Sequence, residues 1–263
     1  MIPLKRFRNI PKVEDKYGNC KITEANLELD KLYTLFPNLY NQGIVTFEFD
    51  RDIYSHENIK KQLIKQQHGK CALCEQHILS LDYGDVEHFR PKGAYIQKSE
   101  SKNYPGYFRL AFDFKNLMLC CKICNQRNKK NLFPIRRIEQ RANIDNIKLL
   151  KEKPFFINPY EENPQNLIWF DKNVAKGKDN NGRGKKTIDS IGLNRKSDGT
   201  FSDLFEKRLE KLKPIESVYK IAKLPLNNGF ISNDEINENI ALLNEHKMKN
   251  KEFSGMIIDN FPI

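Results

Sequence analysis

The feature that most constrains this chain is a pair of C-x-x-C sequences, Cys71–Cys74 and Cys121–Cys124. Each pair places two thiolates on one tight turn, and two such turns supply the four sulfur ligands of a tetrahedral Zn²⁺ site. The 46 residues between the pairs, Glu75–Cys120, are too many for a small zinc ribbon. We therefore expect a structural zinc ion that holds together the two ends of an inserted unit.

The remaining cysteines, Cys20 and Cys120, are expected to be small core residues. Cys121 is preferred to Cys120 as a ligand because its spacing matches that of the first pair. His68 and His77 lie close enough in the sequence to replace a cysteine, and this alternative stays open. Cysteine pairs of this kind are typical of metal binding in a reducing compartment.

Length and charge indicate the size of the fold and the chemistry of its partner. A chain of 263 residues suits about one or two domains. Its net charge of +11 favours a polyanionic partner such as nucleic acid. The window Asp85–Arg141 carries +8 of this charge, which leaves +3 for the rest of the chain. The excess positive charge therefore coincides with the cysteine motifs.

No apolar run follows the opening residues 1–8, and no later stretch approaches the roughly 18 apolar residues of a membrane span. We expect a cytoplasmic protein with no membrane partner.

Local patterns predict several elements around the motifs. Ser55 can cap a helix that ends near Gly69. Short, broken alternation predicts strands within residues 81–89 and 108–119. A helix is expected over Asn125–Leu132, where few residues are β-branched.

The later part of the chain is predicted to be mostly helical. Residues 155–157 and 167–170 are expected to form short buried strands or core-filling loops. A helix is predicted over Asp203–Leu212 and ended by Pro214. Another is predicted from Ser232, where Ser-x-x-Glu forms a capping box.

The segment between the cysteine pairs resembles the HNH, or ββα-metal, nuclease motif. The matching stretches are DVEHFRPKG at Asp85–Gly93 and NLMLCCKICN at Asn116–Asn125. In that family an acidic residue and His end a strand, Asn-Leu opens a second strand, and C-x-x-C followed by Asn or His begins a helix. The resemblance implies an α+β fold in which a four-cysteine zinc site staples a ββα-metal core. It divides the chain into a helical N-terminal extension (1–67), the nuclease core (68–136), and a mixed, then helical C-terminal region (137–263) expected to dock a partner.

Phosphodiester hydrolysis needs a base for the attacking water and a cation on the phosphate, and the motif offers both. A neutral imidazole such as His88 suits the base, and Glu87 and Asn125 suit the oxygen ligands of Mg²⁺ or Mn²⁺. By resemblance, the side-chain carbonyl of Asn116 orients His88. Asn125 stands where many HNH proteins have His, and Glu87 where Asp is commoner, so the ligand geometry is expected to differ.

Basic residues flank the motif and are expected to contact backbone phosphates: Arg90, Lys92, Arg127, Lys129 and Lys130. Phosphate contacts position a nucleic acid without reading its sequence, so we expect little base selectivity here.

A wider resemblance covers nearly the whole chain. The stretches Phe155–Pro159 and Thr187–Arg195, together with the motif, resemble PtuB-type HNH proteins of Septu and certain retron antiphage systems. This resemblance implies a PtuA-like ATPase partner and, in a larger complex, a retron reverse transcriptase with its nucleic acid.

The function expected from the sequence is a metal-dependent endonuclease that cleaves DNA as a defence effector, with water as the attacking group. Two alternatives stay open. The same site could cleave RNA such as tRNA, or the chain could be a non-catalytic zinc module that binds nucleic acid or protein.

Overall fold

A computed structural model describes residues 1–15, 18–78, 84–97, 101–142, 151–179, 181–197 and 204–263. The α-helices of these residues are α1 (Lys21–Leu35), α2 (Pro37–Asn41), α3 (Arg51–Tyr54), α4 (Glu57–Gln67), α5 (Arg183–Ile191), α6 (Leu204–Ala222), α7 (Asn233–Lys247) and α8 (Ser254–Asn260). The strands are β1 (Asp85–His88), β2 (Leu117–Cys120), β3 (Ile168–Asp171) and β4 (Val174–Gly177). The short 3₁₀ helices are η1 (Phe108–Leu110), η2 (Phe114–Asn116), η4 (Ile138–Gln140) and η5 (Pro164–Asn166), and η3 (Ile123–Lys129) is a π-helix.

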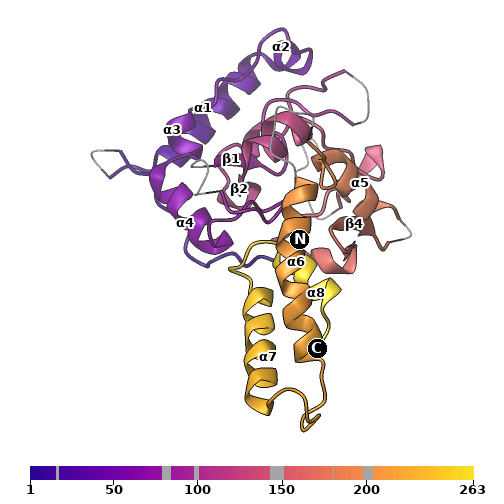
Figure 1. Ribbon diagram of the computed structural model, residues 1–263. Helices are drawn as coiled ribbons and strands as arrows, with labels where there is room; N and C mark the ends of the chain where they lie inside the picture. Colours follow the sequence, from indigo (N-terminus) through magenta and orange to yellow (C-terminus); the bar gives the residue numbers. More distant parts are fainter. Residues whose placement is uncertain (16–17, 79–83, 98–100, 143–150, 180, 198–203) are drawn as a thin grey trace.

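Figure 1 shows α1 to α4 on one side of the central β1–β2 unit, and α6 and α7 in an arm that projects away from it. The mixture of helices and small antiparallel sheets expected of an α+β fold is confirmed, whereas the ββα-metal core stays a prediction. None of the described helices is both long enough and apolar enough to cross a membrane. The three-part division of the chain stays a prediction.

The centre of the fold is the antiparallel pair β1–β2, in which Asp85 lies opposite Cys120 and His88 opposite Leu117. Every residue of β2 is buried. β1 falls within the stretch 81–89 predicted from alternation, and β2 begins within the stretch 108–119 and ends one residue beyond it; η1 and η2 occupy much of the rest of that stretch. Part of the stretch 81–89 lies outside the described residues.

Helix α4 leads the chain to the first cysteine pair. Its apolar residues Ile59 and Leu63 are fully buried. The helix begins two residues after Ser55, because the side chain of His56 accepts the capping hydrogen bond from the backbone of Asn58. It ends where His68 adopts a left-handed conformation, one residue before the predicted Gly69.

The helix after the second cysteine pair is a π-helix, η3, that begins two residues before the predicted start at Asn125. The backbone N–H of Lys130 donates to the carbonyl of Asn125 at 2.9 Å, five residues back. π-Helical turns are rare in proteins overall, and those that occur are often found at functional sites.

The prediction that Pro214 ends a helix is wrong, because α6 continues through it to Ala222. A proline inside a helix costs about 3 kcal/mol. Helices α6 and α7 pack together, and burial of Leu212, Ile215 and Ala222 offsets this cost. Residue 203, where the helix was predicted to begin, lies outside the described residues.

The other predictions for the C-terminal region have mixed outcomes. Residues 155–157 form a core-filling loop, with Ile157 fully buried, whereas 167–170 overlaps β3, which pairs with β4. Ser232 is confirmed as the N-cap of α7, because its hydroxyl accepts from the backbone N–H of Glu235 at 3.1 Å, which is one of the two hydrogen bonds of a capping box. Cys120 is buried as expected. Cys20 is exposed, which corrects its assignment to the core: it occupies the N-cap position at the start of α1.

Candidate functional site

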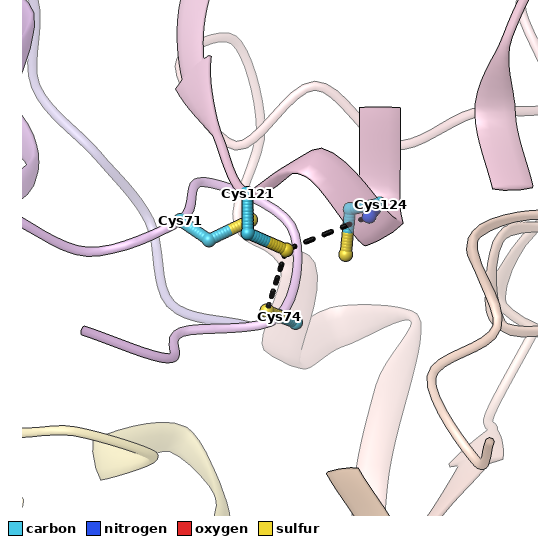
Figure 2. A group of neighbouring side chains, drawn as sticks. All are labelled: Cys71, Cys74, Cys121 and Cys124. Atoms are coloured by element: carbon cyan, nitrogen blue, oxygen red, sulfur yellow. Dashed lines mark hydrogen bonds between the residues drawn. The ribbon is translucent and has the colours of Figure 1, made fainter. Parts of the chain in front are cut away.

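The four paired cysteines meet in one cluster, as Figure 2 shows. All four Sγ atoms lie within 4.8 Å of one another, and the Sγ atoms of Cys74 and Cys121 are 3.9 Å apart. A zinc ion with bonds of about 2.3 Å to sulfur needs tetrahedral sulfurs about 3.8 Å apart. The cluster is therefore the right size for one metal ion.

Cys121, not Cys120, belongs to the cluster, as the spacing predicted. His68 and His77 are not members. Within the described part of the chain, no other group of three or more His, Cys, Asp or Glu residues lies close enough to hold a metal.

One buried amide ties the first cysteine turn to the sheet. The Gln67 side chain donates to the carbonyls of Lys70 and Leu119 and accepts from the N–H of Leu119, each at 2.8 Å. The N–H of Ala72 donates to the Leu119 carbonyl at 3.0 Å. Strand β2 then runs directly into Cys121, so these bonds bring both cysteine turns together.

Two arginines from the C-terminal region lie beside the sulfurs, and no sequence pattern pointed to them. Arg195 donates to the Sγ of Cys124 at 3.6 Å. Burial lowers its pKa, but negative charge on Cys124 and Cys74 outweighs burial and raises it. Arg208, in α6, is fully buried; burial lowers its pKa, and the negative charge of Cys74 opposes this shift. The positive charges of both guanidinium groups act against the negative charge of the thiolates, and Arg208 brings α6 into this interaction.

His88 ends β1, and its ring is fixed from two sides. Its Nε2 lies 2.8 Å from the Ala111 carbonyl. A carbonyl can only accept, so Nε2 carries the proton and Nδ1 keeps its lone pair. The Tyr54 ring meets the imidazole edge-on, with centroids 5.0 Å apart. Burial and the charge of Lys92 lower the pKa of His88 to about 3, although the hydrogen bond to the Ala111 carbonyl acts to raise it. The ring is therefore neutral near pH 7.

The side chain of Asn116 does not orient His88 directly, which corrects the expected contact. Its Oδ1 accepts from the backbone N–H of Arg90 at 2.8 Å, and its Nδ2 donates to the carbonyls of Arg90 and Leu110 at 3.0 and 3.1 Å. Asn116 thus holds the backbone of Arg90, which follows β1, and that of Leu110, the neighbour of Ala111. It therefore affects the orientation of the His88 ring only through the backbone.

Glu87 and Asn125, the expected ligands of one ion, each contact a different protein side chain. The Glu87 Oε1 accepts from the ammonium of buried Lys129 at 2.6 Å, and Lys129 also donates to the His88 carbonyl at 2.8 Å. Asn125 donates to Asp85 at 3.2 Å. The carboxylates of Asp85 and Glu87 lie on the same face of β1, because residues two apart in a strand share a face. Helix η3 covers this face.

Two of the five expected phosphate contacts are corrected, since Lys129 and Arg90 are buried. Arg90 lies 2.8 Å from the carboxylate of Glu152, which is itself fully buried. Lys129 is held by Glu87. Ion pairs satisfy both cations inside the protein, so neither is placed to meet a polyanion. Arg127 and Lys130 are exposed, and Lys92 is half-buried.

A pocket of about 330 Å³ contains Glu87, His88, Lys92 and Lys130. Asn116, Asn125 and Arg127 do not line it. The rest of the lining includes residues that sequence reasoning missed: Thr46, Phe49, Lys102 and Tyr104. The first two precede α3, so the N-terminal segment forms part of the candidate site.

The low pKa of His88 predicts a stability that falls in mild acid. Unfolded histidine takes up a proton below about pH 6.5, whereas folded His88 does so only near pH 3. From about pH 7 to 5.5 the free energy of unfolding should therefore fall by about 1 kcal/mol through this residue. The measurement is urea unfolding of the wild type and of His88→Gln, which keeps an N–H donor for Ala111, at both pH values. The fall in the free energy of unfolding between the two pH values should be about 1 kcal/mol smaller in His88→Gln. Equal pH dependence in both proteins would contradict the assignment.

The fold and the cluster define a mixed α/β protein with a four-cysteine group that can hold a metal ion. The chain is similar to Septu protein PtuB of Bacillus mycoides (strain KBAB4), with 34% identity over 171 residues, or 64% of this chain and 56% of PtuB. It is also similar to part of Septu protein PtuA of the same organism, with 26% identity over 141 residues, or 52% of this chain and 19% of PtuA.

These similarities confirm the resemblance to PtuB expected from the sequence. The chain spans little more than half the length of PtuB and about a fifth of that of PtuA. No protein-family model matches the chain. No solved structure matches it either.

Proposed function

We propose that this chain is the HNH endonuclease of a Septu-type antiphage defence system and hydrolyses phosphodiester bonds in DNA. The observation that carries the proposal is the state of His88. It is a neutral imidazole with a fixed tautomer, next to a carboxylate, in a pocket with lysines. Similarity to two Septu proteins supports the defence role.

In this proposal Nδ1 of His88 takes the proton from the attacking water. The Ala111 carbonyl holds the ring by its other nitrogen, and Tyr54 packs against its edge, so the base is oriented before substrate binds. A base whose pKa is about 3 in the free protein is a weak one. Burial is the main cause of this low pKa, and the charge of Lys92 lowers it further; a bound phosphate would offset the charge of Lys92 and so raise the pKa of His88.

Glu87 and Asn125 would hold the catalytic Mg²⁺ or Mn²⁺. Lys129 takes only one oxygen of Glu87, and Asn125 uses its N–H group toward Asp85, so each residue keeps an oxygen for an ion. When bound, the ion neutralises charge on the phosphate and the leaving oxygen. The cysteine cluster would hold a structural Zn²⁺, for which four thiolates are a preferred donor set.

The C-terminal arm is proposed to dock a PtuA-like ATPase. It exposes Leu226, Phe230 and Met248, and Phe230 is 95% exposed. Apolar residues this exposed on a projecting arm favour a protein partner. The retron reverse transcriptase remains an untested expectation, because the comparisons name Septu proteins alone.

A phage challenge tests the proposal in cells that express this chain with a PtuA-like ATPase. We expect the wild type to protect and His88→Gln to give no protection. His68→Asn, which changes an exposed histidine at a left-handed position that Asn tolerates, should protect like the wild type. Full protection by His88→Gln would instead favour the non-catalytic zinc module.

A further inference from the structure

The pocket around His88 is lined by lysines and by aromatic rings, and the nuclease motif alone does not require this combination. Three lysines line it, each from a different segment: Lys92 follows β1, Lys102 lies in the loop before Tyr104, and Lys130 directly follows η3. Glu87 is the one carboxylate in the lining among the described residues. The charge of the pocket therefore suits more than one phosphate oxygen.

Two half-buried aromatic rings also line this pocket, and backbone holds both in place. Tyr104 packs on Gly43 so closely that a Cβ there would come within 2.5 Å of the ring. Phe49 lies against Gly93, where a Cβ would be 3.3 Å from the ring, and the Lys92 ammonium lies 5.5 Å from the Phe49 centroid. These rings are positioned surfaces next to the lysines.

Positioned aromatic faces beside lysines match the chemistry that binds unpaired nucleotides, because bases stack on the rings while the lysines hold the backbone. The volume of about 330 Å³ is at the small end for sites that hold one small molecule. Bases inside a duplex are stacked and paired, and reaching such a pocket costs unpairing energy.

We propose that this pocket takes one unpaired nucleotide, with its base against Phe49 and Tyr104 and its phosphates on Lys92, Lys102 and Lys130. The preferred substrate is then single-stranded DNA or an unpaired position in a duplex. This inference rests on the proposed nuclease function and adds the state of the substrate. It also assigns a substrate-binding role to Phe49 of the N-terminal segment.

Equilibrium binding to the full-length His88→Gln protein tests the inference without cleavage. The probes are a labelled single-stranded DNA, its perfect duplex, the same duplex with a bulge, and a single-stranded RNA of the same sequence. We expect the single strand and the bulge to bind about 10-fold or more tightly than the duplex. Adding Phe49→Leu, which keeps apolar packing but loses the flat face, should raise Kd about 5- to 100-fold for the single strand.

Two further variants separate stacking from general damage. Phe49→Tyr should restore binding because it keeps the ring. Trp169→Leu is the matched control, since Trp169 also has a lysine ammonium 5.5 Å from its ring but does not line the pocket. It should leave Kd unchanged.

Equal affinity for duplex and single strand, or no effect of Phe49→Leu, would overturn the inference and leave the nuclease proposal standing. Tighter binding of the RNA strand would overturn DNA as the preferred substrate. If the expected binding pattern holds but the wild type cuts no probe with Mg²⁺ or Mn²⁺, the pocket assignment stands and the nuclease proposal fails.

Discussion

Replacing Cys124 by serine should cost the protein its cooperative fold. Structural zinc binds with an apparent free energy of about 10–16 kcal/mol, which matches or exceeds the stability of a typical domain of about 5–15 kcal/mol. The cluster joins α4, β2 and η3, and Arg195 and Arg208 link it to the C-terminal region. Loss of one ligand should therefore loosen both parts of the chain.

Metal content and thermal unfolding measure this effect. The wild type should contain one zinc ion per chain and unfold in a single transition, whereas Cys124→Ser should lose the metal and the transition. Cys120→Ala is the matched control, because it removes a buried thiol next to the cluster without removing a ligand. It should keep the zinc and lose only about 1–2 kcal/mol. A metal-free but normally stable Cys124→Ser protein would contradict a structural role for the cluster.

Spacing was enough to predict the cysteine cluster, because its chemistry is local. The two C-x-x-C turns favoured Cys121 over Cys120 as a ligand, and the structure gathers Cys121 with the other three paired cysteines. The place of His88 at the end of a strand was implied by the resemblance to the HNH motif, and His88 lies at the end of β1.

Spacing did not predict which charged residues are buried. Arg90 and Lys129 follow the motif closely and looked like surface cations. Their partners decide their environment, and Glu152 is 62 residues from Arg90 along the chain. A buried ion pair depends on which distant segments meet, and composition gives no sign of that.

The pocket wall was missed for the same reason. Phe49 and Tyr54 lie in a segment expected only to form a helical extension, yet Phe49 lines the pocket and Tyr54 contacts the His88 ring. Pro214 shows the same limit in a helix, since packing against α7 overrides a strong local preference.

Replacing His88 by glutamine should remove the chemical step of cleavage and keep the fold. General base catalysis contributes about 10²- to 10⁴-fold to a rate, and glutamine cannot accept the proton from water near neutral pH. Its amide can still donate to the Ala111 carbonyl, and Asn116 still holds the loop. We therefore expect kcat to fall about 100-fold or more while substrate affinity changes little.

The most direct test of the proposed function is cleavage of plasmid DNA and of total tRNA by the purified wild-type, His88→Gln and His68→Asn proteins. Each is assayed with Mg²⁺ or Mn²⁺ and with chelator, alone and with a PtuA-like ATPase. We expect metal-dependent cutting of DNA, with 5′-phosphate ends, that His88→Gln loses and His68→Asn keeps. Cleavage confined to tRNA would move the site to an RNA substrate. DNA cutting that His88→Gln retains at the wild-type rate would contradict the central claim that His88 is the catalytic base.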